Sequence, residues 1–493
     1  MRLLRILPEV ILLPFLIRTI GETGYGVFVL AWSLILTIEA LQLDLCSGVI
    51  KYGAAHLAQD RITEVNKVLS TAFIVSAIFG GISCICICIL AGFFGSNMVD
   101  LAFSLTMIAL MVLIMLPTIP YIGIMLARQR YDVNAALDTA FAYIRVLLII
   151  LWFSLAGPSL KALMVISVMT RTLGRLVHVP IAHLIVPGLR NRISLFDLRN
   201  CRALILFGGV ITLCTLFLAV RSTGMKWIMG ALVSTAFVAH MAIIYIPIEL
   251  LSRIVLGMTL TVMPTASKHK AIENETVLQE LLMRGTRYTT ILCCGSFILA
   301  FFLLKPVIIL WLGNEYVHLA RYMLVLFGAA AFQMTSSCAH HMLRGMGCLR
   351  IAFVNSFIGQ ALLPVGITLL FLFWLGNPYW AFTWGMALGY VTYGIMQLVS
   401  CSCVLRMNFR RFFFSAYAEA LLVSGISFTV LYTLVEVFRT NKLIHLIPLT
   451  LTGLVITSGC FYVLFSTQKE KILAKEMISK LMEISKKVQL HRD

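Results

Sequence analysis

The amino-acid sequence predicts an all-α polytopic membrane protein, in which two parallel six-helix lobes surround a central cavity and about two extra C-terminal transmembrane helices follow. Of the 493 residues, 60% are hydrophobic and 12% are charged, whereas soluble domains have about 45–50% and about 25%. The apolar residues form repeated runs of about 20, the length with which a helix crosses roughly 30 Å of hydrocarbon. Because the runs lack the apolar–polar alternation of barrel strands, they are predicted to be helices.

About fourteen such runs divide the chain. The first contains Arg2 and Arg5, and no small-residue cleavage site follows it, so it is predicted to be a span and not a signal peptide. The predicted spans lie near residues 3–20, 26–45, 68–94, 101–126, 134–156, 160–187, 203–220, 227–263, 288–312, 319–343, 351–375, 379–404, 412–437 and 443–465.

Three landmarks recur after six spans, which indicates an internal duplication. They are Gly95 and Gly313, Met125 and Met342, and Ala58 and Ala271, which lie 218, 217 and 213 residues apart. A shift by an even number of spans preserves orientation, so the two repeats are expected to be parallel. The predicted parts are an N-terminal six-helix lobe (1–187), a cytoplasmic linker (188–202), a C-terminal six-helix lobe (203–405), two accessory transmembrane helices (406–466) and a basic amphipathic cytoplasmic tail (467–493).

The distribution of basic residues predicts the orientation. The net charge is +18, and most lysines and arginines fall in alternate loops and near both termini, which are therefore expected to be cytoplasmic. This bias explains the charge without a nucleic-acid partner. The opposite side is predicted to carry only short loops, among them RSTGMK, with the basic residues Arg18, Lys161, Arg221, Lys226, Arg439 and Lys442.

Several segments resemble a known transporter family. They are TIGETGYGVFVLAWSLI at 19–35, LQLDLCSGVIKYGAAHLAQD at 41–60, VMPTASKHKA at 262–271, ILWLGNEYVHLARYMLVL at 309–326 and MLRGMGCLRIAFVNS at 342–356. The chain resembles, over roughly residues 10–405, the polysaccharide (O-antigen) flippases of the multidrug/oligosaccharidyl-lipid/polysaccharide exporter superfamily. The resemblance implies fourteen spans and transport of undecaprenyl-diphosphate-linked oligosaccharide across a bacterial plasma (inner) membrane.

Four arginines inside predicted spans are the candidate substrate-binding residues. Arg171 and Arg175 are four residues apart and share one helix face, Arg145 lies in the fifth span, and Arg253 lies in the eighth. The guanidinium fork binds phosphate oxygens in pairs, so these residues suit a polyprenyl-diphosphate-linked glycan held in membrane lipid. The alternatives are snorkelling, pairing of the first three with acids such as Glu9, Glu39 or Asp44, and a Glu249–Arg253 pair within one helix.

The four intramembrane carboxylates Glu9, Glu39, Asp44 and Glu249 are the candidate groups for coupling to a proton or sodium counter-ion. No catalytic residue, cofactor or metal site is predicted, because the sequence contains no nucleotide-binding glycine loop, nucleophile elbow or metal-ligand spacing. A non-enzymatic flippase is therefore the leading hypothesis. A multidrug or metabolite cation antiporter of the same superfamily is the alternative, and a polytopic polysaccharide polymerase or ligase is less favoured because the outer loops are short.

Overall fold

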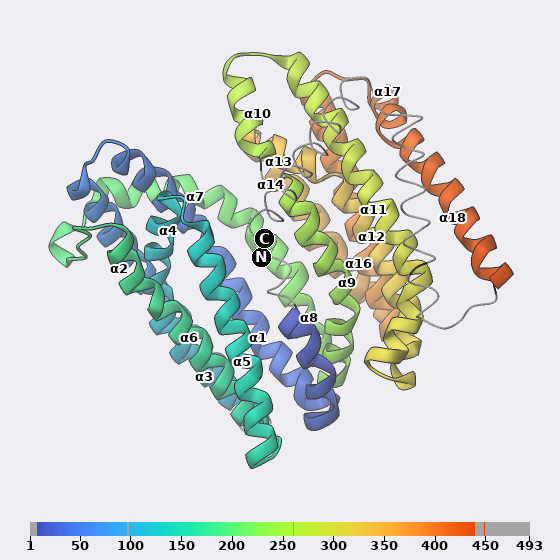
Figure 1. The fold of residues 1–493 in the computed structure, drawn as a ribbon, viewed down its shortest axis with the longest axis horizontal. Helices are drawn as coiled ribbons and strands as arrows, with labels where there is room; N and C mark the ends of the chain where they lie inside the picture. Colours follow the sequence, from blue (N-terminus) through green and yellow to red (C-terminus); the bar gives the residue numbers. More distant parts are fainter. Residues whose placement is uncertain (1–6, 96–97, 260, 439–447, 449–493) are drawn as a thin grey trace, which may run out of the picture.

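A computed structural model describes residues 7–95, 98–259, 261–438 and 448, and these residues form helices and loops without a β-strand. Eleven of the described helical segments are long and apolar enough to cross a membrane. Their outer surfaces carry large exposed apolar side chains, as Ile85, Ile89 and Phe93 do, which is the pattern of helices that face lipid. The predicted all-α polytopic membrane fold is confirmed (Figure 1).

The N-terminal lobe starts with a 51-residue helical segment that Gly21 divides. Gly21 has φ 74° and ψ 169°, a conformation open to glycine but strained for other residues. The two arms of this segment therefore correspond to the first two predicted spans. The helices of the lobe are α1 (Leu7–Leu57), α2 (Ile62–Phe94), α3 (Val99–Met115), η1 (Leu116–Thr118), α4 (Ile119–Ala127), α5 (Tyr131–Ala156) and α6 (Leu160–Ile185).

The C-terminal lobe begins with α7 and ends with α16, whose first turn is capped by Asn377. The Asn377 side chain accepts hydrogen bonds from the amides of Tyr379 and Trp380, which lack intrahelical acceptors. The helices are α7 (Leu198–Ala219), η3 (Val220–Gly224), α8 (Met225–Leu232), α9 (Thr235–Thr259), α10 (Val262–Ala271), α11 (Glu275–Trp311), η4 (Asn314–Leu319), α12 (Ala320–Thr335), α13 (Ser337–Gly345), α14 (Leu349–Ser356), η5 (Phe357–Leu362), α15 (Leu363–Leu375) and α16 (Pro378–Val404).

Backbone conformation repeats between the two lobes. Positive φ angles occur in matching turns, at Asp60 and Glu273, Gln129 and Gly347, Gly157 and Gly376, and Gly188 and Arg406. Members of these pairs lie 213, 218, 219 and 218 residues apart, which is close to the spacing of the landmarks in the sequence. Since a positive φ is uncommon outside glycine, the shared positions support a duplicated six-helix unit.

The turns define two ends of the bundle, and they differ in composition. We call the end formed by loops 58–61, 128–130, 186–197, 272–274 and 405–408 the basic end, since most loop arginines lie there. We call the opposite end, which contains the turns at Gly21, Gly157, Gly313 and Gly376, the glycine end. Under the positive-inside rule, the basic end is expected to face the cytoplasm.

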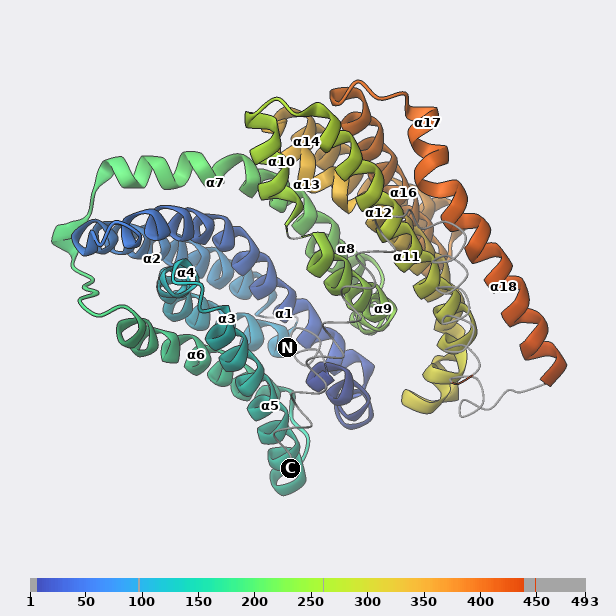
Figure 2. The ribbon, with the colours of Figure 1, turned by 45° about the horizontal axis from the view of Figure 1, so that its top comes forward.

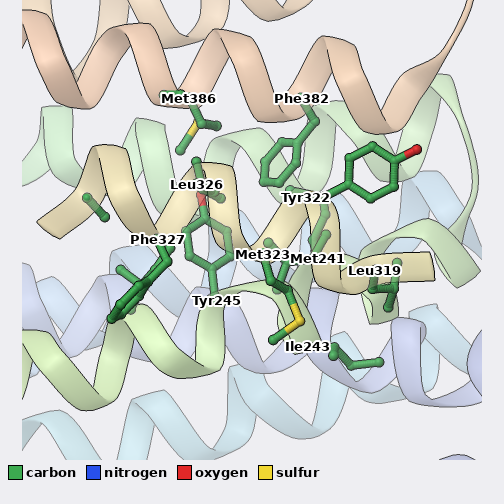
Figure 3. Packing of buried hydrophobic residues seen from close by; sticks show 14 of the residues in the cluster. Met241, Ile243, Tyr245, Leu319, Tyr322, Met323, Leu326, Phe327, Phe382 and Met386 are labelled. Carbon is green, nitrogen blue, oxygen red and sulfur yellow. The ribbon is translucent and has the colours of Figure 1, made fainter. Parts of the chain in front are cut away.

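Each lobe has its own apolar core, and the cores meet along α1 and α9. In the C-terminal lobe, side chains from α9, α12 and α16 interdigitate, with Tyr245, Met323 and Phe382 among them (Figure 3). Leu13 and Ile17 of α1 belong to this same core, and Val238 of α9 belongs to the core of the N-terminal lobe. The two lobes are therefore joined by an apolar seam between α1 and α9.

Helix α7 connects the lobes and contacts both of them (Figure 2). It packs on α1 and α2 of the N-terminal lobe and on α14 and η5 of the C-terminal lobe. The segment before it runs along α2, where the backbone amides of Arg190 and Arg192 donate to Asn66 and Ser70. The helix begins at Leu198, inside the predicted linker 188–202, so the last five residues of that segment are helical.

One accessory helix packs outside the C-terminal lobe. It consists of α17 (Phe409–Phe413), η6 (Phe414–Ala418) and α18 (Glu419–Phe438), and it contacts α11. Arg287 of α11 pairs with Glu419 at 2.6 Å, and the rings of Phe301 and Phe428 lie 4.9 Å apart. The predicted last span at 443–465 and the predicted tail at 467–493 lie outside the described residues, apart from Pro448.

Candidate functional site

A cavity of about 350 Å³ lies between the two lobes. Helices α1, α5 and α6 form one wall, and α8 and α9 form the other. Four cations and two carboxylates line the cavity, so its lining has a net positive charge when all six groups are ionised. The charged residues are Arg145, Arg171, Lys226, Arg253, Glu9 and Glu249, and the aromatic residues are Tyr25, Phe28, Trp32 and Tyr245.

Arg171 and Arg175 project from one face of α6, as their spacing predicts, and both bind Glu39 of α1. Arg171 Nε donates to Glu39 Oε1 at 3.2 Å, and its Nη2 pairs with the other carboxylate oxygen. Arg175 Nη2 lies 3.3 Å from Glu39 Oε1, and its Nη1 lies 3.5 Å from Asp138 of α5. These ion pairs are 10–18% exposed at the side chain, so the charges neutralise each other inside the lobe.

Arg145 of α5 is buried, and its Nη2 lies 3.3 Å from Glu9 Oε1. The Glu9 side chain is 51% exposed and lines the cavity. The guanidinium of Arg145 lies 5.5 Å from the centre of the Trp32 ring, and that of Arg171 lies 5.8 Å from the same ring. Arg145 Nε is buried without a hydrogen-bond partner in the described protein.

The pairing with acids that the sequence left open as an alternative is therefore present in the N-terminal lobe. Three guanidiniums, those of Arg145, Arg171 and Arg175, meet three carboxylates, those of Glu9, Glu39 and Asp138. Asp138 was missed by the sequence analysis. It lies inside the predicted fifth span, at 134–156, so the rule that identified Arg145 would have identified it as well.

The wall formed by the C-terminal lobe differs, because its charges are not paired with each other. Glu249 and Arg253 are four residues apart on α9, yet no ion pair within 4.0 Å joins them among the described residues. Glu249 is exposed, and Arg253 is partly exposed. Lys226 of α8 lies 6.0 Å from the centre of the Tyr245 ring. Neither Lys226 nor Arg253 makes an ion pair with any carboxylate in the described part of the chain.

The prediction that RSTGMK, residues 221–226, forms an outer loop is wrong, because these residues are helical. Helices α7, η3 and α8 run together from Leu198 to Leu232, and the break before α9 falls at Val233 and Ser234. The Ser-Thr-Gly sequence has the composition of a turn, but here it forms the π-helix η3. As a result, Arg221 is buried with its guanidinium 4.4 Å from the centre of the Tyr390 ring, and Lys226 reaches the cavity.

The remaining coupling candidate is Asp44. Its backbone lies in α1, and its side chain falls outside the described part of the structure. Glu9, Glu39 and Glu249 are thus the predicted carboxylates whose positions are described. Glu9 and Glu249 line the cavity from opposite walls, and Glu39 lies behind the first wall, bound to Arg171 and Arg175.

Comparisons with known proteins show the class of fold. No family model matches the chain, and no curated protein matches it in sequence. Solved structures do match. One is described as the inward-facing conformation of a multidrug resistance MATE family transporter of the MOP superfamily, with a TM-score of 0.70 and 12% identity over 82% of this chain and 94% of that one.

Two further structures show the same likeness. A structure described as the outward-facing conformation of a multidrug resistance MATE family transporter has a TM-score of 0.59 and 12% identity, over 81% of this chain and 94% of that one. A MATE structure in complex with MaD3S has a TM-score of 0.61 and 13% identity, over 82% of this chain and 92% of that one. At these identities the likeness is one of fold. The chain is a multi-pass membrane protein with the two-lobed fold of MATE transporters.

Proposed function

We propose that this chain is a non-enzymatic flippase that moves a polyprenyl-diphosphate-linked glycan, such as undecaprenyl-diphosphate-linked oligosaccharide, across a bacterial plasma membrane by alternating access. Both termini and the basic end would be cytoplasmic. The observation that supports this proposal best is the charge of the cavity, where four cations face two carboxylates. A diphosphate is a dense anion, and paired guanidinium and ammonium donors replace the water it loses on entering the membrane.

The unpaired cations of the C-terminal wall are the proposed diphosphate site. Lys226 and Arg253 have no carboxylate partner in the described chain, whereas Arg171 is already bound to Glu39. Arg145 lines the opposite wall. A ligand that bridges the walls would therefore draw the two lobes together. Pockets for small ligands have volumes of about 300–1,000 Å³, so the cavity of about 350 Å³ suits the head group, while the prenyl chain stays in lipid.

The present conformation is proposed to be open toward the cytoplasm. The inward-facing structure has a TM-score of 0.70, whereas the outward-facing structure has a TM-score of 0.59. The seam between α1 and α9 also joins the lobes near the glycine end, which would be the outer side. The carboxylates Glu9, Glu39, Asp44 and Glu249 remain the candidate groups for coupling to a proton or sodium ion, since ion exchange would change the cavity charge.

A multidrug or metabolite cation antiporter is the second candidate, and a specific observation favours it. Glu9 and Glu249 are both exposed to the cavity, beside the aromatic rings of Tyr25, Trp32 and Tyr245. Carboxylates and aromatic faces attract organic cations. The similar solved structures include transporters described as multidrug resistance proteins, which adds weight to this candidate.

Substituting the charges separates the two candidates. The double variant Lys226→Gln, Arg253→Gln is produced in a bacterium that lacks its own O-antigen flippase, and surface glycan is measured beside the membrane content of the protein. If the protein is a flippase, the variant should produce at least about tenfold less surface glycan than the wild type. The reason is that each lost hydrogen bond from a cation to the diphosphate costs about 1.5–3 kcal/mol of binding free energy. Lys161→Gln, an exposed cation at the glycine end, is the matched control and should leave glycan unchanged.

The same variants are tested for export of organic cations such as ethidium. An antiporter gains or keeps export in Lys226→Gln, Arg253→Gln, because the cavity becomes less positive, and it loses export in Glu9→Gln, Glu249→Gln. Normal surface glycan together with faster ethidium export in the first variant would overturn the flippase proposal in favour of the antiporter.

A further inference from the structure

The two lobes are in backbone contact at the glycine end, where α1 meets the start of α9. A Cβ atom built on Gly26 would lie 1.8 Å from the carbonyl oxygen of Thr235, so the two backbones are in direct contact. Phe237 and Val238, in the first turn of α9, are buried. Any opening of the bundle at this end must therefore separate Gly26 from Thr235.

A polar contact crosses the seam beside this point. Glu22 follows the break at Gly21 in α1, and its Oε2 lies 3.1 Å from Nε2 of His240 in α9. The other ring nitrogen of His240, Nδ1, lies 2.6 Å from the hydroxyl of Tyr379, the second residue of α16. His240 is 8% exposed, and the Glu22 side chain is 36% exposed. The carboxylate thus connects a buried imidazole with the solution at the glycine end.

The other titratable groups around His240 come from η4, α12 and α16. The Tyr316 hydroxyl lies beside the Glu22 carboxylate, and the His318 ring lies 5.9 Å from the His240 ring. His318 Nδ1 lies 2.7 Å from the Glu315 carbonyl oxygen. From α12, Arg321 donates to the hydroxyl of its neighbour Tyr322 at 2.8 Å, and the Tyr322 ring stacks on that of Tyr379. Among these described groups, Glu22 is the carboxylate at ion-pair distance from His240.

The strength of the Glu22–His240 contact depends on the charge of the imidazole. The Nε2 atom of His240 is buried and makes no hydrogen bond of good geometry. The attraction between His240 and Glu22 is therefore mainly electrostatic. A protonated imidazolium attracts the carboxylate as a full charge, whereas a neutral imidazole attracts it only through the weaker dipole of its N–H bond. Histidine ordinarily changes charge between about pH 5 and pH 8, a range that the solution outside a bacterium covers.

We propose that Glu22, His240 and Tyr379 form a proton-operated latch, which holds the lobes together at the glycine end when His240 is protonated and releases them when it is neutral. The inference rests on the proposed alternating access, because a latch has a role only if the seam opens. Low outer pH would keep the protein closed toward the outside, and high outer pH would favour the outward-open state. Coupling of transport to outer pH would then arise at a seam, away from the cavity carboxylates.

Hydrogen–deuterium exchange on the full-length protein in lipid nanodiscs tests the latch. The amides of the first turn of α9, Thr235 to Val238, lack intrahelical acceptors. The Phe237 amide donates to Ser234 Oγ at 3.1 Å, so the protection of the other three amides depends on packing against α1. After correction for the intrinsic effect of pH on exchange, wild-type protein should exchange about fivefold more slowly in this turn at about pH 5.5 than at about pH 8. The variant His240→Gln should lose this difference, and Glu22→Gln should lose it too.

Two further variants make the result specific. His318→Gln removes the neighbouring imidazole and should keep the pH difference, while the exchanged pair Glu22→His, His240→Glu should restore it. A pH difference that persists in His240→Gln, or that disappears in His318→Gln, would overturn the proposal, as would its absence from wild-type protein. The measurement uses no glycan lipid, so a negative transport assay and a negative latch assay are independent outcomes.

Discussion

The two walls of the cavity differ in how their charges are balanced. In the N-terminal lobe, Arg171 and Arg175 are held by Glu39 and Asp138 behind the wall. In the C-terminal lobe, Lys226 and Arg253 have no carboxylate at ion-pair distance among the described residues. Buried arginines are therefore not sufficient evidence of a substrate site. The arginines of the first group are compensated by carboxylates within their own lobe, whereas the cations of the second group face the cavity without a carboxylate at ion-pair distance.

The largest expected effect comes from the double variant Arg171→Ala, Arg175→Ala. It leaves Glu39 buried without its cations, so we expect a loss of about 3–5 kcal/mol of stability and much less protein in the membrane. Thermal unfolding in detergent and quantitative immunoblotting measure both. Adding Glu39→Gln should recover part of the loss. An equal loss of stability in the double variant Lys226→Gln, Arg253→Gln would contradict the conclusion that the charges of the two walls are balanced differently.

An intermediate effect is expected where the walls meet. Gly26→Ala places a methyl group against the Thr235 carbonyl, and this overpacking should cost about 1–3 kcal/mol. Gly24→Ala is the matched control, because its Cβ meets only Ile20 at an ordinary 3.4 Å and alanine favours the helix by about 0.5–1 kcal/mol. Calorimetry of the two variants gives the difference. Equal unfolding temperatures would show that α1 and α9 do not touch as described.

The smallest effect on stability is expected for Glu9→Gln. Its side chain is 51% exposed, and pairs that water can reach contribute about 0–1 kcal/mol. Glu39→Gln, the same substitution at a carboxylate only 10% exposed, should cost several times more because Arg171 remains buried. Chemical unfolding of the two single variants sharpens the comparison within one lobe. A larger loss for Glu9→Gln than for Glu39→Gln would contradict the assignment of Glu39 as the structural carboxylate.

Hydropathy predicted the membrane class and most helices, because each span must be apolar along its whole length. The face shared by Arg171 and Arg175 was also predictable, since a helix places residues four apart on one side. Their partner was not, because Glu39 lies 132 residues before Arg171 and only tertiary packing brings α1 to α6. Glu249 and Arg253 show the converse, since correct spacing on one helix did not produce an ion pair.

The main error, at Arg221 and Lys226, has a local cause. Ser222, Thr223 and Gly224 resemble a turn in composition, but Thr223 donates to the Ser33 carbonyl at 3.2 Å, and its hydroxyl lies 2.6 Å from that of Thr37 in α1. Contact with another helix therefore overrides the local preference. The consequence is functional, because Lys226 belongs to the cavity and would otherwise have been excluded from the site.

Helix α7 gives the molecule a stiff covalent link between its halves. It touches α1 and α2 on one side and α14 on the other, so its packing ties it to both lobes. The π-helix η3 at Val220–Gly224 lies between the end of α7 and the start of α8, and such π-helical turns are common sites of helix bending. If the lobes rotate as proposed, α7 and α8 would therefore move as two rigid arms that bend at η3.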